Sequence, residues 1–416
     1  MGINIVYLRK YFLFLLLLVV VLFLTACAKP IALDMKKGLM ADYGASPWYT
    51  EDIKLGTSKV KLSPDTGANF IWVTSNLCKT KACKNHESVD SNQLGFNWID
   101  TNSTERSFGP WGSMITQTAQ IGFSADNIPY TVEDFYASTY YKGNQFEYLA
   151  WDGGIGFPPS SDGMSAGSSF FFASLYNSGK ITEPIFSMVT YESTKEGKLY
   201  LGGENPDEFK EESAIVLQPS PTGANNWIWG TDLYKFMVGE QSISSLKGAV
   251  FFLDSGSSLF KGDDKYVTPI LKQLFSIKDT KGDDIFSKVF DNDGNWISLE
   301  YANQKGPYDY VGILPNISLN IGQSCSSEDN MSAHITLSPS QYSYYVQEGD
   351  RKGKYVPAFS VLNGIGGLLV GSTFMDLFYT TFNYKDIGNG KLNQGDMIIY
   401  KKESGTTPYS VECIKI

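Results

Sequence analysis

The chain reads Lys59-Val60-Lys61-Leu62-Ser63-Pro64-Asp65-Thr66-Gly67, and 189 residues after Asp65 it repeats the pattern as Ala249-Val250-Phe251-Phe252-Leu253-Asp254-Ser255-Gly256. In each copy, a run that favours extended structure ends in an aspartate, a small hydroxyl residue and a glycine. One such tripeptide is common in ordinary turns. Two in matched surroundings indicate an internal duplication that brings two carboxylates together, an arrangement suited to acid–base activation of water.

The match between the two halves extends further along the chain. Asp65 is followed by Trp151-Asp152-Gly153-Gly154-Ile155-Gly156-Phe157, and Asp254 is followed by Gly367-Leu368-Leu369-Val370-Gly371. An Asp-bearing loop and then an apolar, glycine-marked element therefore occur twice in the same order. In this combination the sequence resembles the pepsin-like aspartic peptidases (family A1), over a region from about Tyr49 to Tyr400.

Composition predicts a mostly β protein. Short apolar or alternating runs such as Lys198–Leu201 and Met397–Tyr400 are typical of strands, and helix-length amphipathic runs are few. A helix is expected over Tyr266–Phe275, with Phe170–Tyr176 as its counterpart in the first half. The resemblance implies the bilobal pepsin-like aspartic protease fold, in which two β-rich lobes enclose an active-site cleft.

The first 27 residues have the pattern of a lipoprotein signal peptide. A basic end at Arg9-Lys10 precedes an apolar run from Phe12 to Leu24, and Leu24-Thr25-Ala26-Cys27 resembles a lipobox. We expect lipidation of Cys27 and a location in a bacterial cell envelope, with a plain transmembrane anchor as the alternative. Because Lys29 follows Ala28 where an Asp would signal inner-membrane retention, we expect the outer membrane, either periplasmic or surface-exposed.

The predicted organisation is a signal peptide over 1–27, a tether over 28–48, an N-terminal lobe over 49–188 and a C-terminal lobe over 189–416. Most relatives carry a folded propeptide. Only 38 residues separate Cys27 from Asp65, and the first strands need about half of them. We therefore expect no propeptide and no proteolytic activation, with a propeptide of unusual type as the alternative.

Charge and histidine content exclude several function classes. The formal net charge is −10, which disfavours a nucleic-acid partner. The two histidines, His86 and His334, are isolated and do not form a metal site. The resemblance implies no cofactor, and it implies polypeptide substrates and pepstatin-like inhibitors as partners. We expect the protein to contact the membrane through its lipid anchor. We also expect a monomer.

The resemblance implies catalytic roles for Asp65 and Asp254, which would share one proton because two carboxylates a few ångströms apart do not both ionise easily. The residues expected to support this pair are Thr66, Gly67, Ser255, Gly256 and Ser257. The two hydroxyl residues Thr66 and Ser255 would hydrogen-bond across the lobe interface. The two turn glycines would let the substrate backbone approach.

A hairpin over Ser107–Met114 resembles the family's flap, which closes over substrate. Phe108 aligns with the tyrosine whose hydroxyl normally bonds the indole of Trp72, so we expect a flap held by apolar contact. The alternative places the flap tip at Trp111. The residues expected to bind substrate are Trp72, Phe108, Gly109, Trp111 and Ile155.

Two further departures from the family pattern concern the first Asp turn. Pro64 precedes Asp65 and lacks a backbone donor, and Ala68 replaces a hydroxyl residue that would stabilise the ionised pair. The main prediction is an aspartic endopeptidase. The alternative is a weak or inactive protein of the same fold that acts as a binding or inhibitor protein. A surface adhesin would require the twofold pattern to be chance.

The four cysteines that remain after Cys27 suggest disulfides in an oxidising compartment. Cys78 and Cys83 are close enough in sequence for a small loop, and the family carries such a loop just after its first active-site segment. Cys325 and Cys413 are then left to pair with each other.

Overall fold

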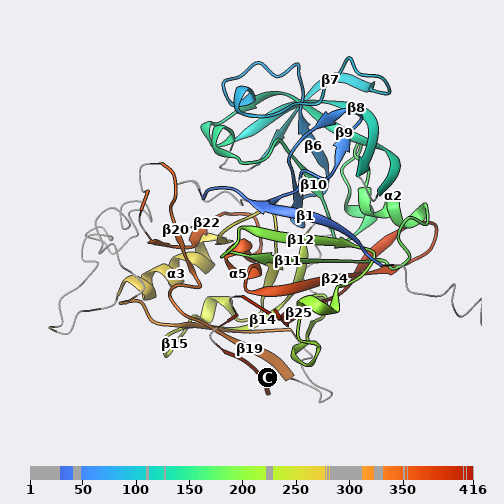
Figure 1. Ribbon diagram of the computed structural model, residues 1–416. Helices are drawn as coiled ribbons and strands as arrows, with labels where there is room; N and C mark the ends of the chain where they lie inside the picture. The colour runs from blue at the N-terminus through green and yellow to red at the C-terminus, as the bar shows by residue number, and fades with distance from the viewer. Residues whose placement is uncertain are drawn as a thin grey trace, which may run out of the picture.

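The computed structural model describes residues 29–40, 48–108, 112–125, 128–221, 228–276, 278, 281, 312–322, 331–349, 352–353, 355–405, 407–408 and 410–415. Three large sheets form the molecule, and Figure 1 shows one of them in the upper lobe and the other two below it. This mostly β architecture is the predicted bilobal, pepsin-like one.

The upper lobe contains an eight-stranded sheet in the order β4-β3-β8-β9-β6-β10-β5, with β7 paired to β8. Its strands are β3 (Lys54–Leu55), β4 (Ser58–Lys59), β5 (Leu62–Asp65), β6 (Ile71–Thr74), β7 (Asn97–Ser107), β8 (Ser113–Ala125), β9 (Ile128–Lys142) and β10 (Gly153–Gly156). The helices of this half are η1 (Ala82–Asn85), η3 (Asn144–Tyr148), η4 (Ser161–Gly163) and α2 (Phe171–Asn177).

The lower lobe contains a nine-stranded sheet in the order β22-β17-β23-β16-β14-β18-β19-β26, with β15 paired to β14, and a separate hairpin of β20 and β21. Its strands are β14 (Trp229–Val238), β15 (Gln241–Ser242), β16 (Ala249–Leu253), β17 (Phe260–Gly262), β18 (Ile317–Ile321), β19 (Met331–Leu337), β20 (Ser343–Tyr345), β21 (Tyr355–Pro357), β22 (Phe359–Val361), β23 (Gly367–Val370) and β26 (Ser410–Lys415). Its helices are η7 (Ser244–Leu246), α3 (Asp264–Phe275) and α5 (Ser372–Met375).

A seven-stranded sheet combines strands from both halves of the sequence, in the order β13-β25-β24-β11-β12-β1-β2. These strands are β1 (Ile31–Lys37), β2 (Trp48–Tyr49), β11 (Ile185–Tyr191), β12 (Glu196–Leu201), β13 (Ile215–Leu217), β24 (Phe378–Asp386) and β25 (Leu392–Lys401). Two short helices, η5 (Pro206–Glu208) and η6 (Glu211–Ser213), lie between β12 and β13. The predicted lobe boundary after Met188 falls inside β11.

The segment predicted as a tether over 28–48 contains a strand of this sheet. β1 pairs antiparallel with β12, and Ile31 lies opposite Leu201. Leu33 and Met35 are each 1% exposed, whereas the residues between and beside them are partly or fully exposed. This alternation has the period of a half-buried strand, so Ile31–Lys37 is part of the folded body.

The duplication predicted from sequence is visible as two copies of one strand arrangement. In the upper lobe, β10 pairs parallel with β5 and antiparallel with β6. In the lower lobe, β23 pairs parallel with β16 and antiparallel with β17. Each glycine-marked element is therefore the central strand of a three-strand unit. In each unit an outer strand, β5 or β16, leads into one of the Asp turns.

Local predictions can be compared with the described elements. The helix predicted over Tyr266–Phe275 is α3, and its counterpart is α2, so both predictions are confirmed. Cys78 and Cys83 form the predicted disulfide. Cys413 is disulfide-bonded, but Cys325 lies outside the described residues, as does Cys27, so their predictions stay open. Across the described ranges, no helix is both long and apolar enough to cross a bilayer.

Candidate active site

The two Asp turns meet in a cleft between the lobes, and the carboxyl groups of Asp65 and Asp254 line it close enough together that the Asp254 charge raises the pKa of Asp65. Each carboxylate is also fixed by its own turn. The Gly67 amide donates to Asp65 Oδ1 at 2.9 Å, and the Gly256 amide donates to Asp254 Oδ1 at 2.9 Å. We call Asp65 and Asp254 the aspartate pair.

Hydroxyl groups join the two turns across the lobe interface, as the sequence predicted. Ser255 N donates to Thr66 Oγ1 at 2.8 Å, and Thr66 Oγ1 donates to the Leu253 carbonyl at 2.9 Å. In the mirrored half, Thr66 N donates to Ser255 Oγ at 3.0 Å, and Ser255 Oγ donates to the Pro64 carbonyl at 2.7 Å. Each turn thus supplies one hydroxyl, one amide and one carbonyl to the other.

This network explains why a proline is accommodated before the first aspartate. Pro64 is buried at the end of β5, and what it contributes to the network is its carbonyl oxygen. Proline lacks only the backbone N–H and keeps the carbonyl. The equivalent position in the other half, Leu253, also contributes a carbonyl.

The turn glycines are required by the opposing carboxylate. A Cβ on Gly67 would lie 2.4 Å from Asp254 Oδ1, and a Cβ on Gly256 would lie 2.2 Å from Asp65 Oδ1. Real Cβ atoms do not approach so closely, so any side chain here would push the pair apart. We had expected these glycines to admit the substrate backbone, and the packing shows that each of them admits the facing aspartate.

Glycines in the second glycine-marked elements also allow a close approach, in this case to the backbone of the Asp turns. A Cβ on Gly156 would lie 2.5 Å from the Ala68 carbonyl, and a Cβ on Gly371 would lie 2.2 Å from the Ser257 carbonyl. Both glycines therefore allow the backbone of the Asp turn to pack directly against the neighbouring strand or its end.

The surroundings of the aspartate pair raise the pKa of Asp65. Burial and the neighbouring Asp254 charge raise the pKa of Asp65 well above its usual range, while the Gly67 amide and the Lys261 ammonium oppose that shift. A raised pKa keeps a proton on the pair at pH values where an isolated aspartate would be ionised. The pair can therefore hold one charge and one proton together, which is what general acid–base chemistry requires.

The cleft above the pair has a volume of about 460 Å³. One wall is aromatic, and the described residues that form it are Phe70, Trp72, Phe108, Phe146 and Trp151. The facing wall belongs to the lower lobe, and its described residues are Ser257, Lys261, Leu362, Asn363, Gly364 and Ile365. The two sides of the cleft therefore differ in chemistry.

The hairpin of β7 and β8 lies at the aromatic wall. Ser107 is paired with Ser113, and the Phe108 amide donates to the Gly112 carbonyl at 2.8 Å. The Phe108 ring lies 5.7 Å from the Trp72 ring, edge to face. Within the described residues the Trp72 indole N–H donates no hydrogen bond, and the two side chains meet through their rings. Gly109 and Trp111 lie outside the described residues.

Ile155 is not where the sequence analysis placed it. Its side chain is 2% exposed and packs in the hydrophobic core, and the residue of β10 that lines the cleft is its neighbour Gly154. Successive residues of a strand face opposite sides, and the run of glycines hid which side faces the cleft. Trp72 packs over Gly154, because a Cβ there would lie 2.8 Å from Trp72 Nε1.

Sequence reasoning missed Lys261 and the loop Leu362–Ile365. Lys261 is seven residues after Asp254, and its Nζ donates to Ser257 Oγ at 3.1 Å. The spacing from the second Asp turn was a usable signal for Lys261. No comparable signal marked the loop, which reaches the cleft through the pairing of β22 with β17.

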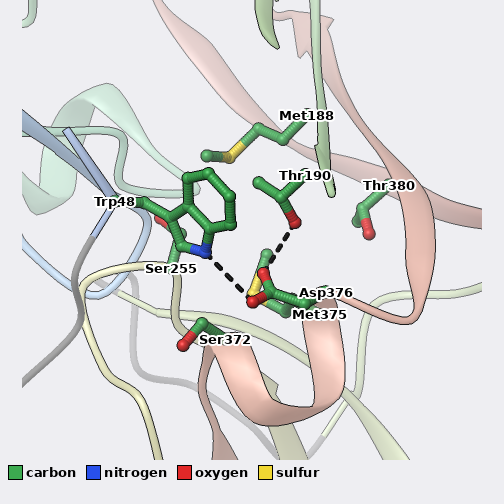
Figure 2. A pocket seen from close by; sticks show the side chains of 8 residues that line it. All are labelled: Trp48, Met188, Thr190, Ser255, Ser372, Met375, Asp376 and Thr380. Atoms are coloured by element: carbon green, nitrogen blue, oxygen red, sulfur yellow. Dashed lines mark hydrogen bonds between the residues drawn. The ribbon is translucent and has the colours of Figure 1, made fainter. Parts of the chain in front are cut away.

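A small cavity of about 20 Å³ lies next to Ser255 of the second Asp turn. Figure 2 shows Asp376 at its edge, where Trp48 Nε1 donates to Asp376 Oδ2 at 3.1 Å and Thr190 Oγ1 donates to Asp376 Oδ1 at 2.6 Å. Lys37 of β1 also reaches this carboxylate, at 3.2 Å. Asp376 thereby ties the first strands of the chain to the lower lobe.

Two β-rich lobes, each contributing an Asp turn to one cleft, define a bilobal aspartic-protease-type fold. A family model described as eukaryotic aspartyl protease matches residues 48–391, most of the chain. The chain belongs to the eukaryotic aspartyl protease family.

Individual relatives are distant. The chain is 25% identical to an aspartic protease of Phaffia rhodozyma over 361 residues, which cover 85% of this chain and 77% of the relative. It is 22% identical to gastricsin of Rattus norvegicus over 361 residues, covering 83% and 79% of the two chains. It is 23% identical to pepsin A of Bos taurus over 229 residues, covering 54% and 58%.

Proposed function

We propose that this protein is an aspartic endopeptidase that hydrolyses peptide bonds in extended polypeptides. The observation that carries the proposal is the aspartate pair: Asp65 and Asp254 line the same cleft, each packed against the turn glycine of the other, and matched turns hold them. Family membership supports a peptide substrate.

The proposed mechanism uses the unequal protonation of the pair. The ionised carboxylate takes a proton from a water held between the two aspartates, and the resulting nucleophile attacks the scissile carbonyl. The protonated carboxyl group polarises that carbonyl, as paired carboxylates do in aspartic proteases, and a proton later passes to the leaving amine. The raised pKa of Asp65 favours this shared-proton state.

The supporting groups keep the pair fixed while charge moves. Thr66 and Ser255 connect the two turns through four hydrogen bonds of 2.7 to 3.0 Å, so the carboxylates do not have to be reoriented during the reaction. The β7–β8 hairpin acts as the flap, and Phe108 covers the aromatic wall. This wall favours a bulky apolar side chain beside the scissile bond.

The test is hydrolysis of denatured haemoglobin by the soluble protein that starts after Cys27, from pH 3 to 7, with and without pepstatin. Asp65→Asn and Asp254→Asn are the matched variants, since asparagine keeps the shape of the side chain and removes its acid–base chemistry. We expect pepstatin-sensitive cleavage by the wild-type protein and none by either variant. The active species should have the N-terminus of the starting protein, because we propose no propeptide.

Absence of cleavage at every pH by a folded protein would contradict the proposal. It would favour the alternative of a binding or inhibitor protein on the same fold. Retained cleavage in both asparagine variants would contradict the assignment of the aspartate pair.

We further propose that the protein is anchored in a bacterial cell envelope through a lipid on Cys27. The lipobox-like sequence that ends at Cys27 supports this proposal. Expression in a bacterial host and detergent fractionation test it. We expect wild-type protein in the membrane fraction and Cys27→Ser protein with its signal peptide uncleaved. The lipid-anchor proposal would be contradicted if the wild-type and Cys27→Ser proteins had equal mobility on gels and mass spectrometry found no acyl group on Cys27.

A further inference from the structure

Lys261 is a buried cation in the wall of the cleft. It lies in β17, is 8% exposed, and lines the same cavity as the aspartate pair. Among the described residues, the charged side chains that line this cavity are Asp65, Asp254 and Lys261. Charged side chains are seldom buried without a role for their charge.

The position of the ammonium group is set by its contacts. Lys261 Nζ donates to Ser257 Oγ at 3.1 Å, and it attracts both aspartates electrostatically. Burial lowers the pKa of Lys261, and these two carboxylates oppose that shift.

Hydrogen bonds hold the loop next to Lys261 against the start of α3. Asp263 accepts hydrogen bonds from the amides of Gly364 and Gly366, at 2.5 and 2.9 Å. Asn363 Oδ1 accepts the Asp264 amide at 2.9 Å. The loop that adjoins Lys261 in the cleft is therefore held against the start of α3. A preorganised wall of this kind is suited to select a side chain.

Neighbouring side chains of an extended peptide point to opposite sides. In this cleft one side is the aromatic wall around Trp72 and Phe108, and the other side carries Lys261. A peptide that places a bulky apolar side chain against the aromatic wall would direct an adjacent side chain toward the ammonium group. In a partly desolvated cleft, a carboxylate gains more from this cation than a neutral amide does.

We propose that Lys261 is a specificity residue that receives a glutamate or aspartate side chain of the substrate, close in sequence to the bulky apolar residue at the scissile bond. This inference rests on the proposed endopeptidase function and names its substrate class as polypeptides in which acidic and bulky apolar residues are neighbours.

The test uses quenched fluorescent peptides that share one central phenylalanine. Each flanking position in turn carries Glu, Gln or Lys, and kcat/KM is measured near pH 5.5, where a peptide glutamate is mostly ionised. For the wild-type protein we expect one position at which Glu is preferred to Gln by about tenfold, which corresponds to about 1.4 kcal/mol. Lys261→Met should abolish this preference and Lys261→Arg should retain it.

Lys265→Met is the matched control, because Lys265 is an exposed lysine on the neighbouring helix α3. It should leave the Glu-to-Gln ratio unchanged. Two results would overturn the inference: equal rates for the Glu and Gln peptides at every position, or a Lys261→Met variant that loses the same factor on all peptides. The second result would mean that Lys261 acts on the aspartate pair and not on the substrate side chain.

A failure of the proposed function can be told apart from a failure of this inference. If no peptide is cleaved, hydrolysis is contradicted, and binding of the same Glu and Gln peptides to the Asp65→Asn protein is measured by calorimetry. Tighter binding of the Glu peptide, lost in Asp65→Asn combined with Lys261→Met, supports the acidic preference without turnover. Equal binding of the two peptides overturns it.

Discussion

Replacing Thr66 with valine should destabilise the protein through the lobe interface. Thr66 is 0% exposed, and its hydroxyl accepts the Ser255 amide at 2.8 Å and donates to the Leu253 carbonyl at 2.9 Å. Valine has nearly the same shape but cannot form either bond. The change therefore removes two hydrogen bonds and leaves a buried amide and a buried carbonyl unpaired.

The expected cost follows from these two orphaned groups. A buried polar group left without its partner costs about 1–3 kcal/mol, so the two groups together should lower the free energy of unfolding of Thr66→Val by about 2–6 kcal/mol. This is a large share of the roughly 5–15 kcal/mol that stabilises a typical folded domain. Equilibrium unfolding in urea measures the loss.

Thr66→Ser is the matched control, because serine keeps the hydroxyl and removes only a methyl group. It should retain most of the stability. Ser255→Ala should cost a similar amount to Thr66→Val, since it leaves the Thr66 amide and the Pro64 carbonyl without their partner. The reasoning would be refuted if Thr66→Val changed the unfolding free energy by less than about 0.5 kcal/mol, or if Thr66→Ser were equally damaging.

Three further changes give distinct outcomes. Glu133 is 0% exposed, and burial raises its pKa from 4.5 to about 7. Its contribution to stability is therefore complete below pH 4.5 and is lost as the pH rises to about 7. Glu133→Gln should remove this pH dependence and exceed the wild type by about 3 kcal/mol above pH 8; equal unfolding free energies at pH 5 and pH 8 in the wild type would contradict this. Ala68→Ser should supply a hydroxyl to the ionised aspartate pair and move the acid limb of kcat/KM to lower pH, and an unchanged limb would argue against that role. Phe108→Ala should raise KM about tenfold or more because the flap loses its ring contact with Trp72, whereas Phe108→Tyr should not, and equal KM values for the two variants would exclude ring packing as the cause.

The sequence was most informative where the duplication left a repeated pattern. Asp65 and Asp254, with their hydroxyl and glycine neighbours, were identified because each copy supports the other, and the glycine-marked strands β10 and β23 were identified for the same reason. Local rules also sufficed for α3, whose apolar residues recur at helical spacing, and for the Cys78–Cys83 loop.

Features that depend on distant pairing were not predictable in this way. Strand β1 was assigned to a tether because its partner β12 is more than 150 residues away, and nothing near Ile31–Lys37 announces that partner. Ile155 was assigned to the wrong face because glycines on both sides conceal the alternation of side chains.

The exchange of hydrogen bonds between the two Asp turns also constrains how this sequence can evolve. Each turn is completed by groups that the other half of the gene encodes: Thr66 needs Ser255 and Leu253, and Ser255 needs Thr66 and Pro64. The two halves share one strand arrangement, yet neither can change alone at these positions. A change at one turn is tolerated where the other turn uses only its backbone carbonyl, as at Pro64. A change to a hydroxyl residue requires a compensating change 189 residues away.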